Sequence, residues 1–154
     1  MIMLILASWA TPSLVGPDVD HLFLGASKDV PWGSKQPAYP AGQCQERKNG
    51  ITKCRHSDWA ADAATRYEDH RVYCHGRLAS TTTYMYGKEM KAFSLLLSGA
   101  FQARAGAATA ITNGQQWTRN GTVVQLRGPD AALPSPLNLA YTVTTWSIAE
   151  LSAC

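Results

Sequence analysis

The chain has 154 residues, and 14 basic against 11 acidic side chains give it a formal net charge of +3. This length predicts one domain that is large enough to bury a hydrophobic core. Charged residues make up 16% of the sequence, below the roughly 25% of ordinary soluble domains. No run of Lys or Arg stands out, so composition and charge do not indicate a dedicated nucleic-acid-binding protein.

The N-terminal residues resemble a secretory signal peptide. An apolar run from Met1 to Leu6 is followed by small residues, and the first charged side chain is Asp18. We therefore predict a signal peptide over residues 1–16 and a secreted, extracellular protein; the alternative is a buried strand over residues 1–7. We expect no membrane span, because spanning needs about 20 apolar residues and prolines interrupt this run.

The remaining chain divides into an arm and a domain. Residues 17–42 are rich in glycine and proline, which predicts an irregular N-terminal arm. Residues 43–154 are expected to form a single domain of the α+β class. We expect a small, mainly antiparallel sheet with two helices packed on it, stabilised by disulfides.

The first predicted helix covers residues 57–69. Ser57 is a good N-cap, and Trp59, Ala63 and Tyr67 follow at intervals of four residues, which gives one apolar face. The helix lies within the segment 54–75, which also holds most of the histidines.

A strand and a second helix are predicted next. Threonines and tyrosines between residues 71 and 86 favour a strand. Residues 88–105 are expected to be helical, because apolar side chains recur there at i+3 and i+4. These side chains are Met90, Phe93, Leu96, Leu97 and Phe101.

The C-terminal third predicts a hairpin and a last strand. Asn120-Gly121 is typical of a two-residue turn. Pairing around it places Trp117 opposite Val124, on a face that should pack against a helix. A final strand is expected over residues 137–146.

The four cysteines form an even set, which in an exported chain predicts two disulfides. Spacing alone does not decide the pairing. We favour Cys44–Cys154 and Cys54–Cys74, because a terminal cysteine is useful mainly for tying the tail down.

One group of residues suggests acid–base chemistry of the kind that cleaves RNA. Two histidines, or a glutamate and a histidine, can supply the base and the acid near neutral pH, and a guanidinium can stabilise the charged transition state. The alternative is that these histidines are surface or capping residues. The candidates are His56, Glu68, His70, Arg71 and His75.

Other chemistry receives less support. The spacing of Cys54-x-His56 and of Cys74-His75 is not that of the usual zinc sites, so we expect no metal and no cofactor. Asn120 begins an Asn-Gly-Thr sequon and is a glycosylation candidate. Aromatic residues beyond those needed for a core suggest a binding surface, although Trp117 and Tyr84 are expected in the core.

Together these features predict a small secreted, disulfide-bonded binding protein, effector- or toxin-like, that acts on a host or competitor molecule. Its partner would be a protein or a glycan, and we expect a monomer without enzymatic activity. The alternative is a secreted ribonuclease-like enzyme that acts on RNA with the histidine and glutamate candidates.

Overall fold

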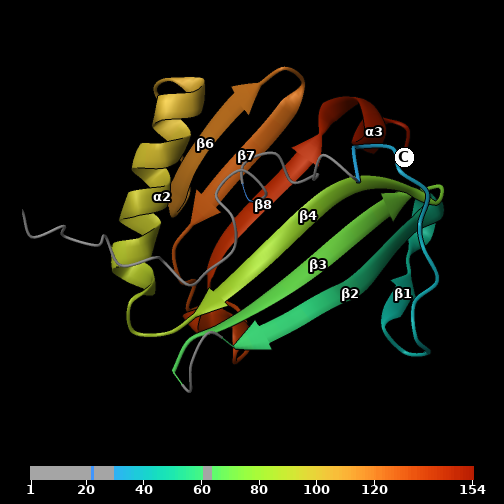
Figure 1. Ribbon diagram of the computed structural model, residues 1–154, viewed down its shortest axis with the longest axis horizontal. Coiled ribbons are helices and arrows are strands. Elements are labelled where there is room, and N and C mark those ends of the chain that lie inside the picture. The colour runs from blue at the N-terminus through green and yellow to red at the C-terminus, as the bar shows by residue number, and fades with distance from the viewer. Residues whose placement is uncertain (1–21, 23–29, 61–63) are drawn as a thin grey trace, which may run out of the picture.

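The computed structural model describes Leu22, residues 30–60 and residues 64–154. The main element is an eight-stranded antiparallel sheet with the strand order β1-β2-β3-β4-β8-β7-β6-β5 (Figure 1). The strands are β1 (Cys44–Glu46), β2 (Ile51–Ala60), β3 (Arg66–Cys74), β4 (Arg77–Tyr86), β5 (Thr109–Ile111), β6 (Gly114–Arg119), β7 (Thr122–Arg127) and β8 (Tyr141–Ser147). In the described residues the α-helices are α2 (Met90–Ala105) and α3 (Ile148–Ser152), with short 3-10 helices η1 (Lys48–Gly50) and η2 (Leu137–Leu139).

One face of the sheet is covered by α2, which lies beside β6 and packs mainly against β6 and β8 (Figure 1). Phe101 and Trp117 meet edge to face with 5.3 Å between their ring centroids, and both are almost fully buried. The core residues shared by the helix and the sheet are Met90, Phe93, Leu97, Phe101, Tyr67, Met85, Trp117, Val124, Leu126 and Val143.

The arm over residues 30–42 covers the other end of the same face. Its backbone joins the start of β4, where Gly33 N donates to Leu78 O at 2.8 Å and Leu78 N to Ser34 O at 2.8 Å. A second core cluster of Cys54, Tyr73 and Leu78 lies under this part of the arm. Neither α2 nor the arm covers the opposite face of the sheet, which we call the open face.

The predicted helix over residues 57–69 is wrong. These residues belong to β2, to β3 and to the turn between them, and Trp59 and Tyr67 are partners across the strand pair. An apolar pair eight residues apart lies on one helical face, but it also matches a hairpin. Ala63, the middle member of the predicted face, lies outside the described residues.

The rest of the element order is close to the prediction. The helix at Met90–Ala105 and the β6–β7 hairpin are confirmed, including the pairing of Trp117 with Val124. Leu96 was expected on the buried face, but it is 57% exposed. The second helix is the short C-terminal α3, so the structure is mostly sheet, and the α+β label holds only roughly.

Both disulfides are present, but the favoured pairing is wrong. Cys44 pairs with Cys54 and Cys74 with Cys154. Cys44 and Cys54 are direct cross-strand partners of β1 and β2, so this disulfide joins two adjacent strands. As expected, the C-terminal cysteine ties the tail to the sheet. Two disulfides suggest an oxidising compartment.

The predicted signal peptide over residues 1–16 and the first part of the arm, apart from Leu22, lie outside the described residues. Among the residues that are described, no helix combines the length and apolar character needed to cross a bilayer.

Candidate functional site on the open face

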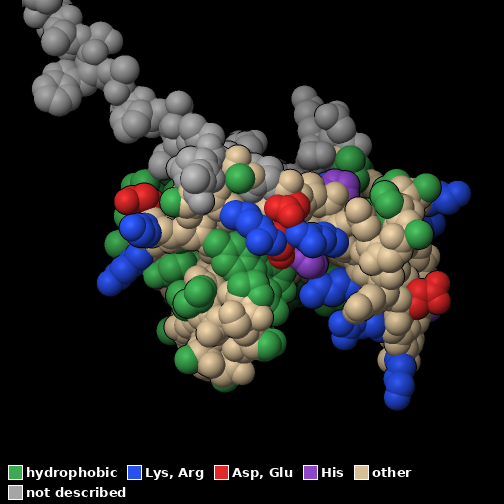
Figure 2. All heavy atoms as spheres, turned by 90° about the horizontal axis from the view of Figure 1, so that it is seen from below, with side chains coloured by type: hydrophobic (Ala, Val, Ile, Leu, Met, Phe, Trp, Pro, Cys, Tyr) green, Lys and Arg blue, Asp and Glu red, His purple; other side chains and the backbone are tan. Residues whose placement is uncertain are grey.

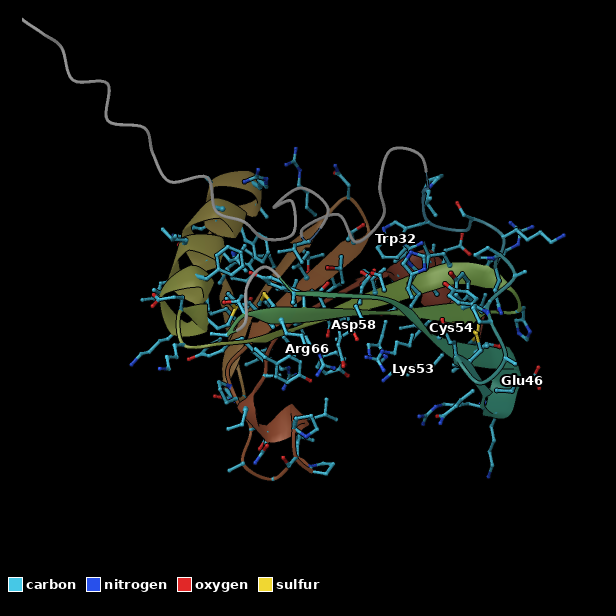
Figure 3. All side chains as sticks on the ribbon, turned by 60° about the horizontal axis from the view of Figure 1, so that its bottom comes forward. Trp32, Glu46, Lys53, Cys54, Asp58 and Arg66 are labelled. Carbon is cyan, nitrogen blue, oxygen red and sulfur yellow. A yellow bond between two sulfur atoms is a disulfide. The ribbon has the colours of Figure 1, made fainter. Side chains whose placement is uncertain are left out.

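The open face carries a cluster of charged side chains from β2 and β3. Strand alternation directs every second side chain to this face. Register then places Arg55 beside His70 and Asp58 beside Glu68. In Figure 2 basic side chains surround a small acidic group, with a histidine beside them. Figure 3 shows Lys53 and Arg66 on one side of the sheet and Trp32 on the other.

Glu68 is the centre of the cluster. Its carboxylate accepts a hydrogen bond from Arg55 Nη2 at 3.1 Å and another from Arg66 Nη2. Asp58 contacts the same two guanidiniums, at 2.5 Å from Arg55 and 3.4 Å from Arg66. The Glu68 side chain is 11% exposed, whereas both arginine side chains are 46% exposed. The two carboxylates therefore hold two solvent-facing guanidiniums in fixed positions.

Two tyrosines of β4 lie next to cations of this cluster, Tyr84 next to Lys53 and Tyr86 next to Arg66. Lys53 Nζ lies 5.9 Å from the centre of the Tyr84 ring, and Arg66 Cζ lies 5.5 Å from that of Tyr86. Tyr84 also meets the His70 ring edge to face at 5.0 Å. Tyr84 was expected in the core; it is half-buried and lies on the open face instead. The cluster is thus a mixed aromatic and cationic surface.

His70 is neutral over most of the pH range. Burial, followed by the nearby charges of Lys53 and Arg55, lowers its pKa from 6.5 to about 4. Its Nε2 lies 3.4 Å from Glu68 Oε2. Because a carboxylate only accepts hydrogen bonds, Nε2 carries the imidazole proton in this contact.

A pocket of about 230 Å³ lies at the β1 end of the open face. Its lining holds three cations and His70, together with glutamine side chains. A neighbouring pocket of about 320 Å³ follows the outer edge of β2 and shares Arg55 with the first one. The lining of the first pocket is Gly42, Gln43, Gln45, Arg47, Lys53, Arg55 and His70.

His56 lies apart from Glu68 and His70. It is the extra residue of a bulge in β2, and its Nδ1 is 3.0 Å from the hydroxyl of Tyr39 in the arm. That hydroxyl is also 2.6 Å from the Tyr73 hydroxyl. Burial and the bond to Tyr73 raise the pKa of Tyr39, which therefore remains a phenol. His56 is thus part of the contact between the arm and the sheet.

The two other acid–base candidates also lie elsewhere. Arg71 lies beside the buried Asp69, with 3.7 Å between Nε and the carboxylate. His75 is in the turn between β3 and β4, next to the disulfide of Cys74 and Cys154. Of the predicted set, the structure therefore brings together Glu68 and His70. The glycosylation candidate Asn120 is exposed at the tip of the β6–β7 hairpin.

The sequence did not point to Lys53, Arg55, Asp58 or Arg66 as parts of a site. Charged residues alternate with other residues along β2 and β3, and this pattern could have indicated the site. It has that meaning only if the two segments are recognised as strands. Comparison with protein-family models, with curated proteins and with solved structures finds no match for this chain.

Proposed function

We propose that this protein is an exported binding protein that recognises an anionic ligand on the open face of its sheet. The observation that carries the proposal is Glu68, which holds the guanidiniums of Arg55 and Arg66 side by side at the surface. Guanidiniums that are fixed before binding lose little conformational freedom when they meet a carboxylate, sulfate or phosphate. The disulfides support export, because such bonds persist in oxidising compartments.

The charges of the open face support an anionic ligand. Among the described residues, its basic side chains are Arg47, Lys53, Arg55, Arg66 and Arg127, and the acids of its charged cluster are Asp58 and Glu68. Both acids are engaged by the guanidiniums of Arg55 and Arg66, so the remaining basic side chains give the face a net positive charge. An anion that approaches this face gains attraction without displacing a carboxylate.

A test compares two double variants that remove the same charge. Arg55→Gln/Arg66→Gln changes the open face, whereas Lys88→Gln/Lys91→Gln changes exposed lysines at the start of α2. Binding to heparin, poly-glutamate and a single-stranded RNA is measured for both at low salt. We expect the arginine variant to lose binding to at least one of these polyanions and the lysine variant to retain it. No polyanion binding by the wild type, or equal losses in both variants, would contradict the proposal.

A second candidate is the ribonuclease-like enzyme, which the contact between Glu68 and His70 favours. With a pKa of about 4, His70 serves as a base and not as an acid near neutral pH. The test is cleavage of a labelled RNA by the wild type and by His70→Ala. An enzyme loses cleavage in this variant while its thermal stability stays nearly the same; a pure binding protein cleaves RNA in neither form.

A further inference from the structure

The pocket at the β1 end of the open face has the chemistry of a phosphate site. Among the described residues that line it, Arg47, Lys53 and Arg55 are cations and none is a carboxylate. Guanidinium and ammonium groups are the strongest donors to phosphate oxygens in proteins. Lys53 and Arg55 lie on β2, and Arg47 directly follows β1. The Cys44–Cys54 disulfide joins β1 to β2 covalently, which holds these segments together.

The cations of the open face extend well beyond this pocket. Arg66 lies further along the sheet on β3, and Arg127 lies on β7, four strands away from Arg55 in the order β2-β3-β4-β8-β7. With strands about 4.8 Å apart, Arg55 and Arg127 are separated by roughly 19 Å. A single phosphate can contact the cations at only one end of this span. A ligand that contacts both Arg55 and Arg127 must therefore carry several anionic groups along a chain.

The surface between these cations contains hydrogen-bonding and aromatic side chains. Thr82 and Thr144 are joined across β4 and β8 by a 3.1 Å hydrogen bond, and Gln125 donates to Gln116 at 2.7 Å. Arg66 lies over the ring of Tyr86. Aromatic rings and stacked guanidiniums are the surfaces on which unpaired bases stack. A sulfated glycan would use the cations but has no bases to stack there.

We propose that the open face binds a single-stranded nucleic acid, with one phosphate in the pocket of Arg47, Lys53 and Arg55 and with bases against Tyr84 and Tyr86. This inference rests on the proposed function and names its ligand. Glu68 and Asp58 orient the arginines and do not contact the strand. The polar side chains of Thr82 on β4, Thr144 on β8 and Gln125 on β7 offer hydrogen bonds to sugars and bases.

The experiment measures fluorescence anisotropy of labelled RNA and DNA oligonucleotides of mixed sequence at several salt concentrations. For four phosphate contacts, release of counterions predicts a loss in affinity of about 50-fold between 50 and 200 mM salt. Arg47→Gln or Lys53→Gln should reduce the slope of log affinity against log salt by about 0.7. Lys91→Gln, which removes a charge from α2, should leave affinity and slope unchanged.

A further variant separates a nucleic acid from other polyanions. Tyr84→Leu should weaken oligonucleotide binding by at least about fivefold through lost stacking and leave heparin binding unchanged. Thermal melting first verifies that the variant folds; if it does not, Tyr86→Leu takes its place. Binding of heparin but of neither oligonucleotide would overturn this inference and leave the proposed function standing. Oligonucleotide binding that is insensitive to both tyrosines and to Lys53 would also overturn it, and no binding of any polyanion would remove both proposals.

Discussion

Arg55 on β2 and Glu68 on β3 are joined across the strand pair by a 3.1 Å hydrogen bond between Nη2 and Oε1. The carboxylate is largely covered, whereas the guanidinium is half-exposed. Arg66, two residues before Glu68 on β3, contacts the same oxygen. One covered acid therefore positions two surface cations, an arrangement that is suited to recognition of an anion.

Loss of the Glu68 charge should weaken both the fold and the site. In Glu68→Gln one neutral amide replaces the carboxylate that both arginines share. Because these arginines are partly solvated, we expect a loss of only about 1–2 kcal/mol in the free energy of unfolding. Urea unfolding measures this loss, and anisotropy measures the accompanying drop in polyanion affinity. Asp58→Asn, which changes a more exposed acid of the same cluster, is the matched control and should cost less.

Stability should fall in acid because of His70. Its pKa is about 4 in the folded protein and 6.5 as a free group. Between these values the unfolded chain binds more protons than the folded one, so stability decreases as the pH falls from about 6.5 towards 4. The groups that face the ring are Lys53, Arg55, Glu68 and Tyr84.

The comparison that tests this effect uses His70→Asn. Urea midpoints are measured for the variant and the wild type at neutral pH and near pH 5. The variant should lose less stability than the wild type on acidification. If the two proteins lose the same amount, His70 does not titrate as described.

Each disulfide should contribute according to the loop that it closes. The Cys74–Cys154 bond joins residues 80 apart in sequence, and the Cys44–Cys54 bond joins residues 10 apart. Chain entropy predicts that the long-loop bond contributes about 4.5 kcal/mol and the short-loop bond about 2.8 kcal/mol to the free energy of unfolding. Denaturant unfolding of Cys74→Ala/Cys154→Ala and of Cys44→Ala/Cys54→Ala compares the two. A larger loss from the short loop would show that strand packing, and not chain entropy, decides the order.

The buried face of α2 should tolerate substitution far less than its exposed face. Phe101 is fully buried against Trp117, whereas Leu96 on the same helix is 57% exposed. Phe101→Ala should lower the free energy of unfolding by about 3–5 kcal/mol. Leu96→Ala should change it by no more than about 0.5 kcal/mol. Thermal melting followed by tryptophan fluorescence gives both values. Equal losses would mean that the orientation of the helix is wrong.

The elements that the sequence predicted well are those with a local signal. The Asn120-Gly121 turn fixed the register of its hairpin, and the spacing of Phe93, Leu97 and Phe101 marked the inner face of α2. These features depend on neighbouring residues, so one segment is enough to reveal them.

The prediction for the β2–β3 segment was wrong because its apolar pattern fits both a helix and a hairpin. Residues eight apart, such as Trp59 and Tyr67, lie on one side of a helix and also face each other in a hairpin. If that segment is a helix, its charges do not alternate between two faces and indicate no surface. The absence of a run of basic residues likewise gave no hint of this cationic cluster, because neighbouring strands bring Lys53, Arg55 and Arg66 to one face without any run.

The central claim is that anions bind at the cations held by Glu68, and the most direct test is a chemical-shift titration. Protein labelled with ¹⁵N is titrated with sodium tripolyphosphate, a small probe that needs neither bases nor sugars. We predict saturable shifts at the amides of Lys53, Arg55 and His70, with α2 unaffected, and their loss in Arg55→Gln/Arg66→Gln. Shifts confined to α2, or the same shifts in the double variant, would contradict the claim.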